Sequence, residues 1–331
     1  MHRNIWLLIA CLALTAAGVG LHFFSWQNSP TNLIKDMTYS LPSGASSLHV
    51  IEQLHQLEVI DQPGYFRILV ELEGRAGQLR AGEYLLRQGM TPRELLNQFV
   101  TGSVITYNVQ IPEGITVARL LKLLNSNANL TPLPDKIDQS NLAAYLGLGI
   151  VYAEGFFLPE TYQVERFEEV ADVLIRAHRQ MRAALTREWN MRREGLLLKD
   201  KEALLTLASL IEKETGMVED RARISQVFHK RLSINMRLQT DPTVIYALGA
   251  HFDGNLTRED LDTQSPYNTY QVRGLPPSPI ALPSIAALKA AAHPADTEFL
   301  YFVARGDGTS HFSRTLNEHN SAVRRYQINA K

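Results

Sequence analysis

An almost continuous apolar run extends from Ile5 to Trp26 and contains no Asp, Glu, Lys or Arg. A helix of about 20 apolar residues spans the hydrocarbon core of a bilayer. The run ends in an aromatic cluster of Phe23, Phe24 and Trp26, and aromatic side chains favour the membrane–water interface. These features predict a transmembrane anchor at residues 1–27 and leave the remaining residues to form the folded body.

The charges beside this run predict its orientation. Arg3 precedes it, and the next basic side chain is Lys35, so we expect a cytoplasmic N-terminus and a body on the other side of the membrane. A cleavable signal peptide is one alternative, but the small residues between Ala13 and Ala17 lie inside the run. A lipoprotein box at residues 8–11 is another, but only seven residues precede it. A retained anchor is therefore favoured.

Length and composition place the body among ordinary globular proteins. The chain has 331 residues, 45% of them apolar and 20% charged, and its net charge is −1. This length suits about two domains. Because there is no basic excess, we expect no nucleic-acid partner. Cys11 is the only cysteine, so the body can form no internal disulfide.

A weak internal repeat follows a polar linker predicted at residues 28–40. At Gly44, Gly89 and Gly114, the glycine precedes Ser or Thr and then the start of an amphipathic helix. Short strands alternating with short helices describe a small α/β module at residues 41–125. Its other predicted elements are a helix at residues 65–70 and strands at residues 79–86 and 103–111.

This module resembles LysM, a family that binds the N-acetylglucosamine backbone of peptidoglycan and chitin. A structural spacer without glycan affinity is the alternative. A connector at residues 126–149, which contains two prolines and several Asn, leads to a C-terminal domain at residues 150–331.

The segment from Leu204 to Thr215 has helical periodicity. At about 100° per residue, its Leu, Ile and Ala side chains gather on one side, whereas Thr206, Ser209 and Lys213 fall on the other. Glu214 projects into the apolar stripe, and Glu212 lies at its border. Burial should raise the pKa of the Glu214 carboxyl toward neutrality, which is the state that a general acid needs. The predicted neighbours of Glu214 are Leu207, Leu210, Met217 and Val218.

Two features also allow a purely structural interpretation. Glu214 could instead pair with Arg221 or Arg223, because ion pairs also perturb carboxylates. The aromatic loop at residues 154–162, with Glu154 and Glu160, could grip sugar rings by stacking and hydrogen bonding. Loop aromatics that are simply buried are the alternative.

Five motifs occur in order in the C-terminal half. They are Glu212-Lys-Glu-Thr215, Leu238-Gln-Thr-Asp-Pro-Thr-Val244, Pro266-Tyr-Asn-Thr-Tyr270, Gly274-Leu-Pro-Pro277, and Tyr301-Phe-Val303 followed by His311-x-x-x-Thr315. Together with the anchor and the module, they resemble the MltG (YceG-like) endolytic murein transglycosylases over essentially the whole chain. The family usually continues with glycines where this chain has Ser278 and Ser284.

The resemblance implies lytic cleavage between N-acetylmuramic acid and N-acetylglucosamine in nascent peptidoglycan strands, which leaves 1,6-anhydromuramyl ends. It assigns catalysis to Glu214 and implies cell-wall synthases as partners at the inner membrane. A single carboxyl suffices, because Glu214 can first protonate the glycosidic oxygen and then accept the proton of the muramyl 6-hydroxyl. We therefore expect no cofactor.

The remaining candidates are predicted to hold the sugar or to orient Glu214. They are Glu212, Gln239, Asp241, Tyr267, Asn268 and Tyr270. Asp241 and Asn268 could equally be local turn residues, and Asp241 could be the second carboxylate of a hydrolase. His311 and His319 lie eight residues apart without a third ligand nearby, so we expect no metal site.

The sequence thus predicts an α+β protein of three parts: a transmembrane helix, a small LysM-like module and a mixed α+β catalytic domain. It is expected in the inner membrane as a single-pass protein with a periplasmic body. The alternative function is a membrane-anchored, peptidoglycan-binding scaffold with little or no catalysis.

Overall fold

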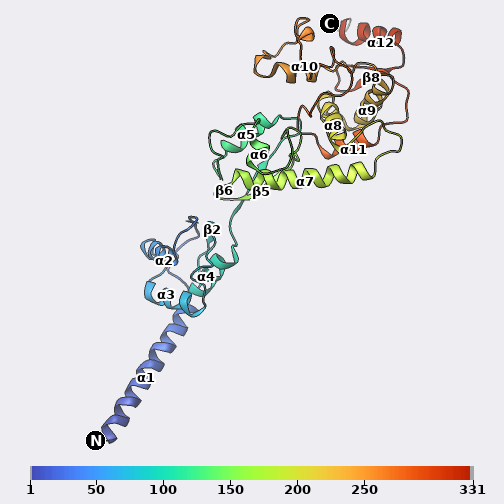
Figure 1. Ribbon diagram of the computed structural model, residues 1–331. Coiled ribbons are helices and arrows are strands. Elements are labelled where there is room, and N and C mark those ends of the chain that lie inside the picture. Colours follow the sequence, from blue (N-terminus) through green and yellow to red (C-terminus); the bar gives the residue numbers. More distant parts are fainter. Residues whose placement is uncertain (1, 329–331) are drawn as a thin grey trace. The chain divides into compact units, whose positions relative to one another are not determined.

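A computed structural model describes residues 2–328, and the chain divides into two units (Figure 1). The first unit comprises the residues up to 107 together with residues 163–167. The second comprises residues 108–162 and the residues from 168 onward. Four two-stranded sheets accompany the helices of the described chain, which confirms the predicted mixed α+β class.

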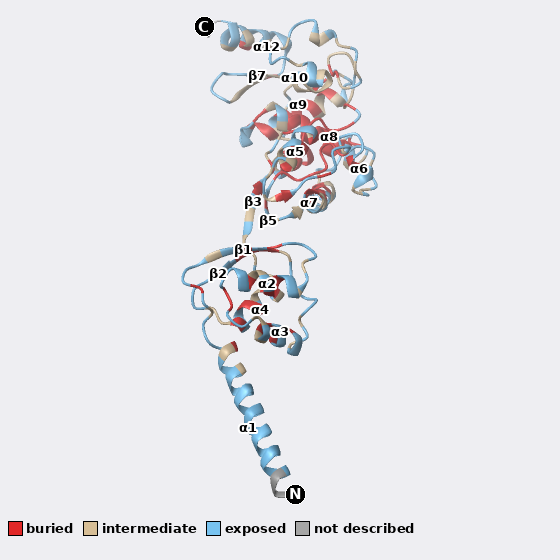
Figure 2. Ribbon diagram, turned by 90° about the vertical axis from the view of Figure 1, so that its left-hand side faces the viewer, coloured by how far each residue is buried: buried red, intermediate tan, exposed pale blue. Residues whose placement is uncertain are grey.

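The first unit begins with the long helix α1, His2–Gln27. Within residues 2–328, it alone is long and apolar enough to cross a membrane, judged by length and composition, over Ile5–Gln27. Its side chains are exposed along almost its whole length (Figure 2). An exposed apolar helix of this length is what a bilayer-spanning segment requires.

The rest of the first unit packs three helices against a two-stranded sheet. Strand β1, Met37–Leu41, pairs antiparallel with β2, Gly82–Leu86, and Met37 lies opposite Leu86. The helices are α2 (Ser47–Gln56), α3 (Pro63–Leu72) and α4 (Pro92–Thr101). Tyr84, Phe66 and Phe99 are fully buried among them.

Local sequence explains where these helices begin. The Ser46 side chain caps α2, and a capping box formed by Thr91 and Glu94 starts α4. The helix predicted at residues 65–70 is confirmed as part of α3. The strand expected at residues 79–86 starts only at Gly82, and β1 was not predicted.

The second unit is mainly helical. Strands β3 and β5 form a two-stranded sheet. Strands β4 and β6 pair parallel, whereas β7 and β8 pair antiparallel. The strands are β3 (Thr106–Gln110), β4 (Leu130–Thr131), β5 (Thr161–Glu165), β6 (Glu168–Glu169), β7 (Tyr301–Ala304) and β8 (Ser310–Ser313). The helices are α5 (Val117–Asn125), α6 (Leu142–Tyr145), α7 (Val170–Asn190), α8 (Lys201–Glu214), α9 (Val218–Ser233), α10 (Asp241–Leu248), α11 (Ile285–Ala292) and α12 (Leu316–Val323).

Helix α8 is the centre of this unit and contacts α7, α9, α10 and α11. Every residue from Ala203 to Ile211 is buried. On the predicted polar side, Lys213 is exposed, whereas Thr206 and Ser209 are buried. Its hydroxyl groups can be buried because they are hydrogen-bonded. Thr206 Oγ1 donates to the Glu202 carbonyl at 2.9 Å, and Ser209 Oγ donates to the Thr206 carbonyl at 2.7 Å.

The predicted neighbours of Glu214 beyond the helix are also wrong. Helix α8 ends at Glu214, and Thr215 is extended with φ −153°. Met217 and Val218 therefore do not continue the apolar stripe, and both are exposed. The three residues 215–217 redirect the chain into α9.

The aromatic loop is part of the core. Phe156, Phe157 and Tyr162 are buried, which supports the structural alternative for these rings. The loop also packs closely against Pro279: a Cβ on Gly155, where φ is +84°, would lie 2.5 Å from the Pro279 Cβ. Only glycine tolerates both this conformation and this approach.

Candidate active site

Glu214 occupies the last position of α8, and its side chain is partly buried. Thr240 Oγ1 donates a hydrogen bond to Glu214 Oε1. The pKa of Glu214 is raised to about 7, chiefly by burial and also by the nearby Asp241 charge, although the hydrogen bond from Thr240 and the Arg231 charge lower it. The predicted rise in this pKa is confirmed. A carboxyl with such a pKa can donate or accept a proton near neutral pH.

A cluster of threonines fixes Thr240. The Thr240 backbone N–H donates to Thr269 Oγ1 at 3.1 Å, and Thr243 Oγ1 donates to the Thr240 carbonyl at 2.7 Å. Thr240 itself is buried. Sequence analysis missed Thr240, although it lies between the two selected residues Gln239 and Asp241. Its role depends on a contact with a residue 26 positions earlier in the chain.

Arg231 is a second residue that sequence analysis missed. Its guanidinium is buried, with Nε donating to the Leu300 carbonyl at 2.8 Å and Nη1 to the Leu238 carbonyl at 2.5 Å. Its positive charge lowers the pKa of Glu214. Since Leu238 begins the segment that carries Thr240, Arg231 also ties α9 to the loop beside Glu214.

Asp241 and Tyr270 meet at the start of α10. Tyr270 Oη donates to Asp241 Oδ1 at 2.5 Å, and Asp241 is exposed in the first turn of the helix. Burial and the Asp241 charge raise the pKa of the Tyr270 hydroxyl, which stays protonated and able to donate. Gln239 is exposed beside them, with the left-handed φ of +51°. Of the predicted site residues, Gln239 and Asp241 therefore flank Thr240 in the chain, and Tyr270 is hydrogen-bonded to Asp241.

Asn268 and Tyr267 are engaged with protein groups. Asn268 is fully buried, and its Nδ2 donates to the Leu261 carbonyl at 3.0 Å and the Thr263 carbonyl at 2.8 Å. These bonds match the turn role that was the alternative for Asn268. Tyr267 Oη lies 2.7 Å from Ser278 Oγ, and its ring centroid lies 4.9 Å from that of Tyr246.

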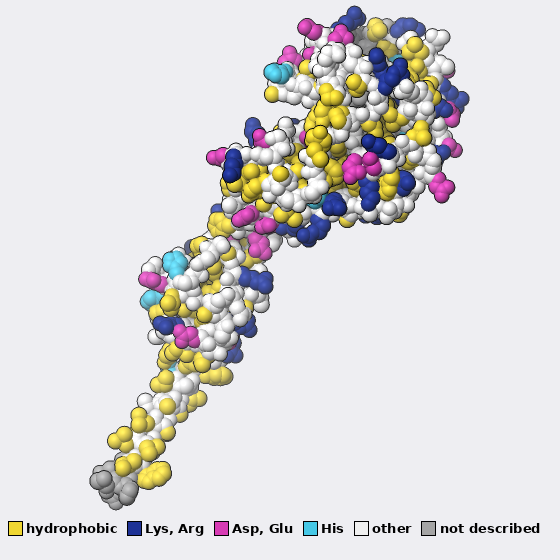
Figure 3. Space-filling model, in the orientation of Figure 1, with side chains coloured by type: hydrophobic (Ala, Val, Ile, Leu, Met, Phe, Trp, Pro, Cys, Tyr) yellow, Lys and Arg dark blue, Asp and Glu magenta, His cyan; other side chains and the backbone are white. Residues whose placement is uncertain are grey.

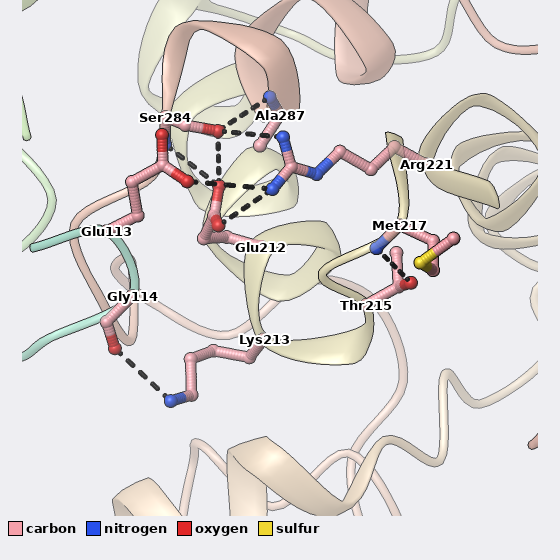
Figure 4. A network of polar contacts seen from close by, with 9 residues as sticks. All are labelled: Glu113, Gly114, Glu212, Lys213, Thr215, Met217, Arg221, Ser284 and Ala287. Carbon is pink, nitrogen blue, oxygen red and sulfur yellow. Dashed lines mark hydrogen bonds and ion pairs between the residues drawn. The ribbon is translucent and has the colours of Figure 1, made fainter. Parts of the chain in front are cut away.

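Glu212 belongs to a buried polar network with Arg221 and Ser284 (Figure 4). Arg221 Nη2 donates to Glu212 Oε1 at 3.1 Å, and the Ser284 backbone N–H donates to Oε2 at 2.9 Å. Glu113 lies 3.7 Å from the same guanidinium. The alternative that Glu214 pairs with Arg221 is therefore wrong, because Glu212 takes that partner.

The same network holds the last turn of α8 in place. Lys213 points to the other side and donates to the Gly114 carbonyl at 3.2 Å (Figure 4). The Thr215 hydroxyl accepts from the Met217 backbone N–H at 3.0 Å and closes the turn. Glu212 and Lys213, just before Glu214, are thus bonded to α9, to the N-cap of α11 and to the loop before α5. This arrangement fixes the position of the Glu214 carboxyl.

A second buried carboxyl with a raised pKa lies outside this group. Burial raises the pKa of Glu154 to about 7, against hydrogen bonds from the Val117 N–H at 3.0 Å and from Tyr246 Oη at 3.4 Å. Its partners place it at the N-terminus of α5 and beside α10. Within residues 2–328, no group of three or more His, Cys, Asp and Glu side chains is arranged to hold a metal ion.

Several known proteins are similar to this chain in sequence or fold. A protein-family model described as the YceG-like family matches residues 39–325. An endolytic murein transglycosylase of Bacillus subtilis is 31% identical, over 87% of this chain and 84% of the relative. One of Streptococcus pneumoniae is 27% identical, over 97% of this chain and 64% of the relative, so this chain spans less than two thirds of its length. A crystal structure of a yceG-like protein of Listeria monocytogenes has a TM-score of 0.53 and 28% identity, covering 87% of this chain and 99% of that one.

Proposed function

Because this chain belongs to the YceG-like family, we propose that it is an endolytic lytic transglycosylase of peptidoglycan. It cleaves the bond between N-acetylmuramic acid and N-acetylglucosamine in nascent strands and leaves 1,6-anhydromuramyl ends, which terminates strand elongation. The observation that carries this proposal is Glu214, a partly buried carboxyl whose pKa is raised to about 7. The names of the Bacillus and Streptococcus relatives agree with it.

Glu214 acts alone as acid and base. In its protonated form it donates to the glycosidic oxygen while the bond breaks through an oxocarbenium-like state. The resulting carboxylate accepts the proton of the muramyl 6-hydroxyl, which attacks the anomeric carbon of the same sugar. An intramolecular nucleophile has a high effective concentration, so neither a bound water nor a second carboxylate is required. Thr240 and Arg231 stabilise the carboxylate between the two steps.

Gln239, Asp241 and Tyr270 contact the substrate in this proposal. Their support is that they surround the Thr240 segment and that Gln239 and Asp241 are exposed. The polar groups of Glu212, Tyr267 and Asn268 are bonded to protein, so for these we propose a positioning role; their substrate contacts stay a prediction. The catalytic domain remains assigned to residues 150–331.

The anchor and the module complete the proposal. Helix α1 crosses the inner membrane once, with a cytoplasmic N-terminus, a periplasmic body and cell-wall synthases as neighbours. Its support is the apolar stretch Ile5–Gln27 and the basic residue before it. The LysM-like module at residues 41–125 binds glycan in this scheme, a property inferred from resemblance.

The products released from purified sacculi by the full chain in detergent micelles test the function. Mass spectrometry should find muropeptides that end in anhydromuramic acid, 18 Da lighter than hydrolysis products because no water is added. Reducing muramic acid ends would instead identify a muramidase. Binding to sacculi without any released product would identify the scaffold.

Thr240→Val tests the hydrogen bond to Glu214. Without the donated hydroxyl, the carboxylate loses stabilisation, so the pKa of Glu214 should rise further. The alkaline limb of the pH–rate profile should then move up by about one pH unit. Thr240→Ser keeps the hydroxyl and serves as the matched control. An unchanged profile in the Val variant would show that Thr240 does not tune Glu214.

A further inference from the structure

The start of α3 is fixed to the last turns of α1 within the first unit. The Tyr65 ring centroid lies 5.6 Å from those of both Phe23 and Trp26, and Tyr65 Oη lies 3.1 Å from His22 Nδ1. Trp26 Nε1 also donates to Asp61 Oδ1 at 2.9 Å, just before α3 begins. These contacts set the position of α3 relative to the apolar helix.

Helix α3 has a third face besides its buried and polar ones. Phe66, Leu69 and Val70 are buried in the core of the unit. Arg67 and Glu71 form an exposed ion pair at 2.8 Å. The third face carries residues at spacings i, i+3 and i+7, which lie above one another on a helix. These residues are Tyr65, Ile68 and Leu72, and Ile68 and Leu72 are 44% and 73% exposed.

The third face continues the apolar surface of α1. A groove of about 540 Å³ runs along α1 and is closed on one side by Tyr65 and Ile68. Its α1 residues all belong to the stretch Ile5–Gln27: Leu12, Thr15, Ala16, Val19, Gly20 and Phe23. Figure 3 shows hydrophobic side chains along α1 and on the end of the unit that adjoins it.

We propose that α3 lies in the membrane interface, with Ile68 and Leu72 among the lipid acyl chains. This rests on the proposed anchoring role of α1. If α1 spans the bilayer, the groove beside Val19 and Ile68 is at lipid depth, so acyl chains occupy it. The Arg67–Glu71 pair then faces the headgroups, as in an interfacial amphipathic helix. Trp26 and Tyr65 take the positions that aromatic side chains prefer at this boundary.

A lipid occupant fits better than a protein partner because the groove is continuous with the apolar surface of α1. Isolated exposed apolar residues need no explanation, but these two are continuous with a helix surface that has to be covered by lipid. The first unit then contacts the membrane at two points, through the end of α1 and through α3. These two contacts fix its orientation relative to the bilayer.

Depth-dependent fluorescence quenching in the full chain tests whether α3 lies in the membrane interface. Cys11 is the only cysteine, so Cys11→Ala gives a background in which single labelled cysteines can be placed. Leu72→Cys reports on α3. Leu14→Cys, in the exposed surface of α1, is the control for lipid contact. Leu85→Cys on β2, at the end of the unit away from α1 in Figures 1 and 2, is the control for water contact.

The chain is reconstituted in phosphatidylethanolamine–phosphatidylglycerol vesicles that contain doxyl-labelled lipid. We expect the label at 72 to lose at least about twofold more fluorescence to doxyl lipid than the label at 85, and to resist aqueous iodide. Equal quenching at 72 and 85 would overturn the proposal. Protection at 72 from both quenchers would also overturn it, in favour of a protein that covers α3.

Two controls separate this result from the other proposals. Absence of lipid quenching at 14 would overturn the anchor and, with it, the membrane position of α3. The quenching does not depend on glycan cleavage. The experiment therefore distinguishes an enzyme without activity from a chain whose α3 lies outside the membrane. Because Leu72 is largely exposed, its replacement removes little packing, and unchanged cleavage of sacculi by the labelled chain would verify the fold.

Discussion

Glu214→Gln should lower the rate of anhydromuramyl-end formation by about 10²–10⁴-fold, the usual contribution of a general acid–base group. Gln has the same shape and can still bond to the Thr240 hydroxyl, so the fold should persist. It can neither protonate the glycosidic oxygen nor accept the proton of the 6-hydroxyl. The measurement is the initial rate of product release from sacculi, quantified by mass spectrometry.

Glu202→Gln is the matched control for this variant. Glu202 is an exposed carboxylate in the first turn of the same helix α8, so its replacement should leave the rate unchanged. If Glu214→Gln retained activity and Asp241→Asn lost it, the catalytic role would pass to Asp241. Full activity in both variants would contradict the proposed site.

The raised pKa of Glu214 also predicts the pH dependence of the wild-type enzyme. Cleavage requires the protonated form, so the rate should fall as pH rises above about 7. The sign for stability is the same: the folded-state pKa lies above the ordinary value of 4.5, so the folded state loses stability as pH rises from 4.5 through about 7. Glu214→Gln should remove this part of the loss, as measured by chemical unfolding at several pH values.

Arg221→Met should reduce the free energy of unfolding by about 3–5 kcal/mol. The side chains of Arg221 and Glu212 are 7% and 5% exposed, so removing the guanidinium leaves a buried carboxylate without its ion-pair partner. Ser284 alone cannot neutralise that charge. Activity should fall as well, because the network holds the turn that carries Glu214. Urea unfolding of the full chain in detergent, with activity on sacculi, checks both expectations.

Two further variants make this test specific. Lys230→Met, also on α9, breaks an ion pair at 2.8 Å with Glu298. The two side chains are 38% and 68% exposed, so this loss should destabilise the fold far less than the loss of Arg221. Arg221→Met combined with Glu212→Met should be more stable than Arg221→Met alone, because no unpaired charge remains. Equal losses for the Arg221 and Lys230 variants would show that the buried pair does not hold this region.

Local sequence was sufficient for much of the fold. The apolar run, the Ser and Thr caps and the helical periodicity of α8 predicted helices at these places, because each signal depends on residues a few positions apart. The pattern failed for the surroundings of α8. Hydroxyl groups at Thr206 and Ser209 indicated a solvent-exposed face, but hydrogen bonds to the backbone allow them to be buried.

The sequence by itself determined the family, the apolar segment Ile5–Gln27 and the raised pKa of Glu214, since a carboxylate that projects into an apolar helix stripe is desolvated when that stripe is buried. Only the tertiary structure decided the partners of the two glutamates. Arg221 pairs with Glu212, and Thr240 donates to Glu214 from 26 residues downstream. Such contacts depend on how α8, α9 and the loop before α10 pack, and spacing along the chain carries no information about that packing.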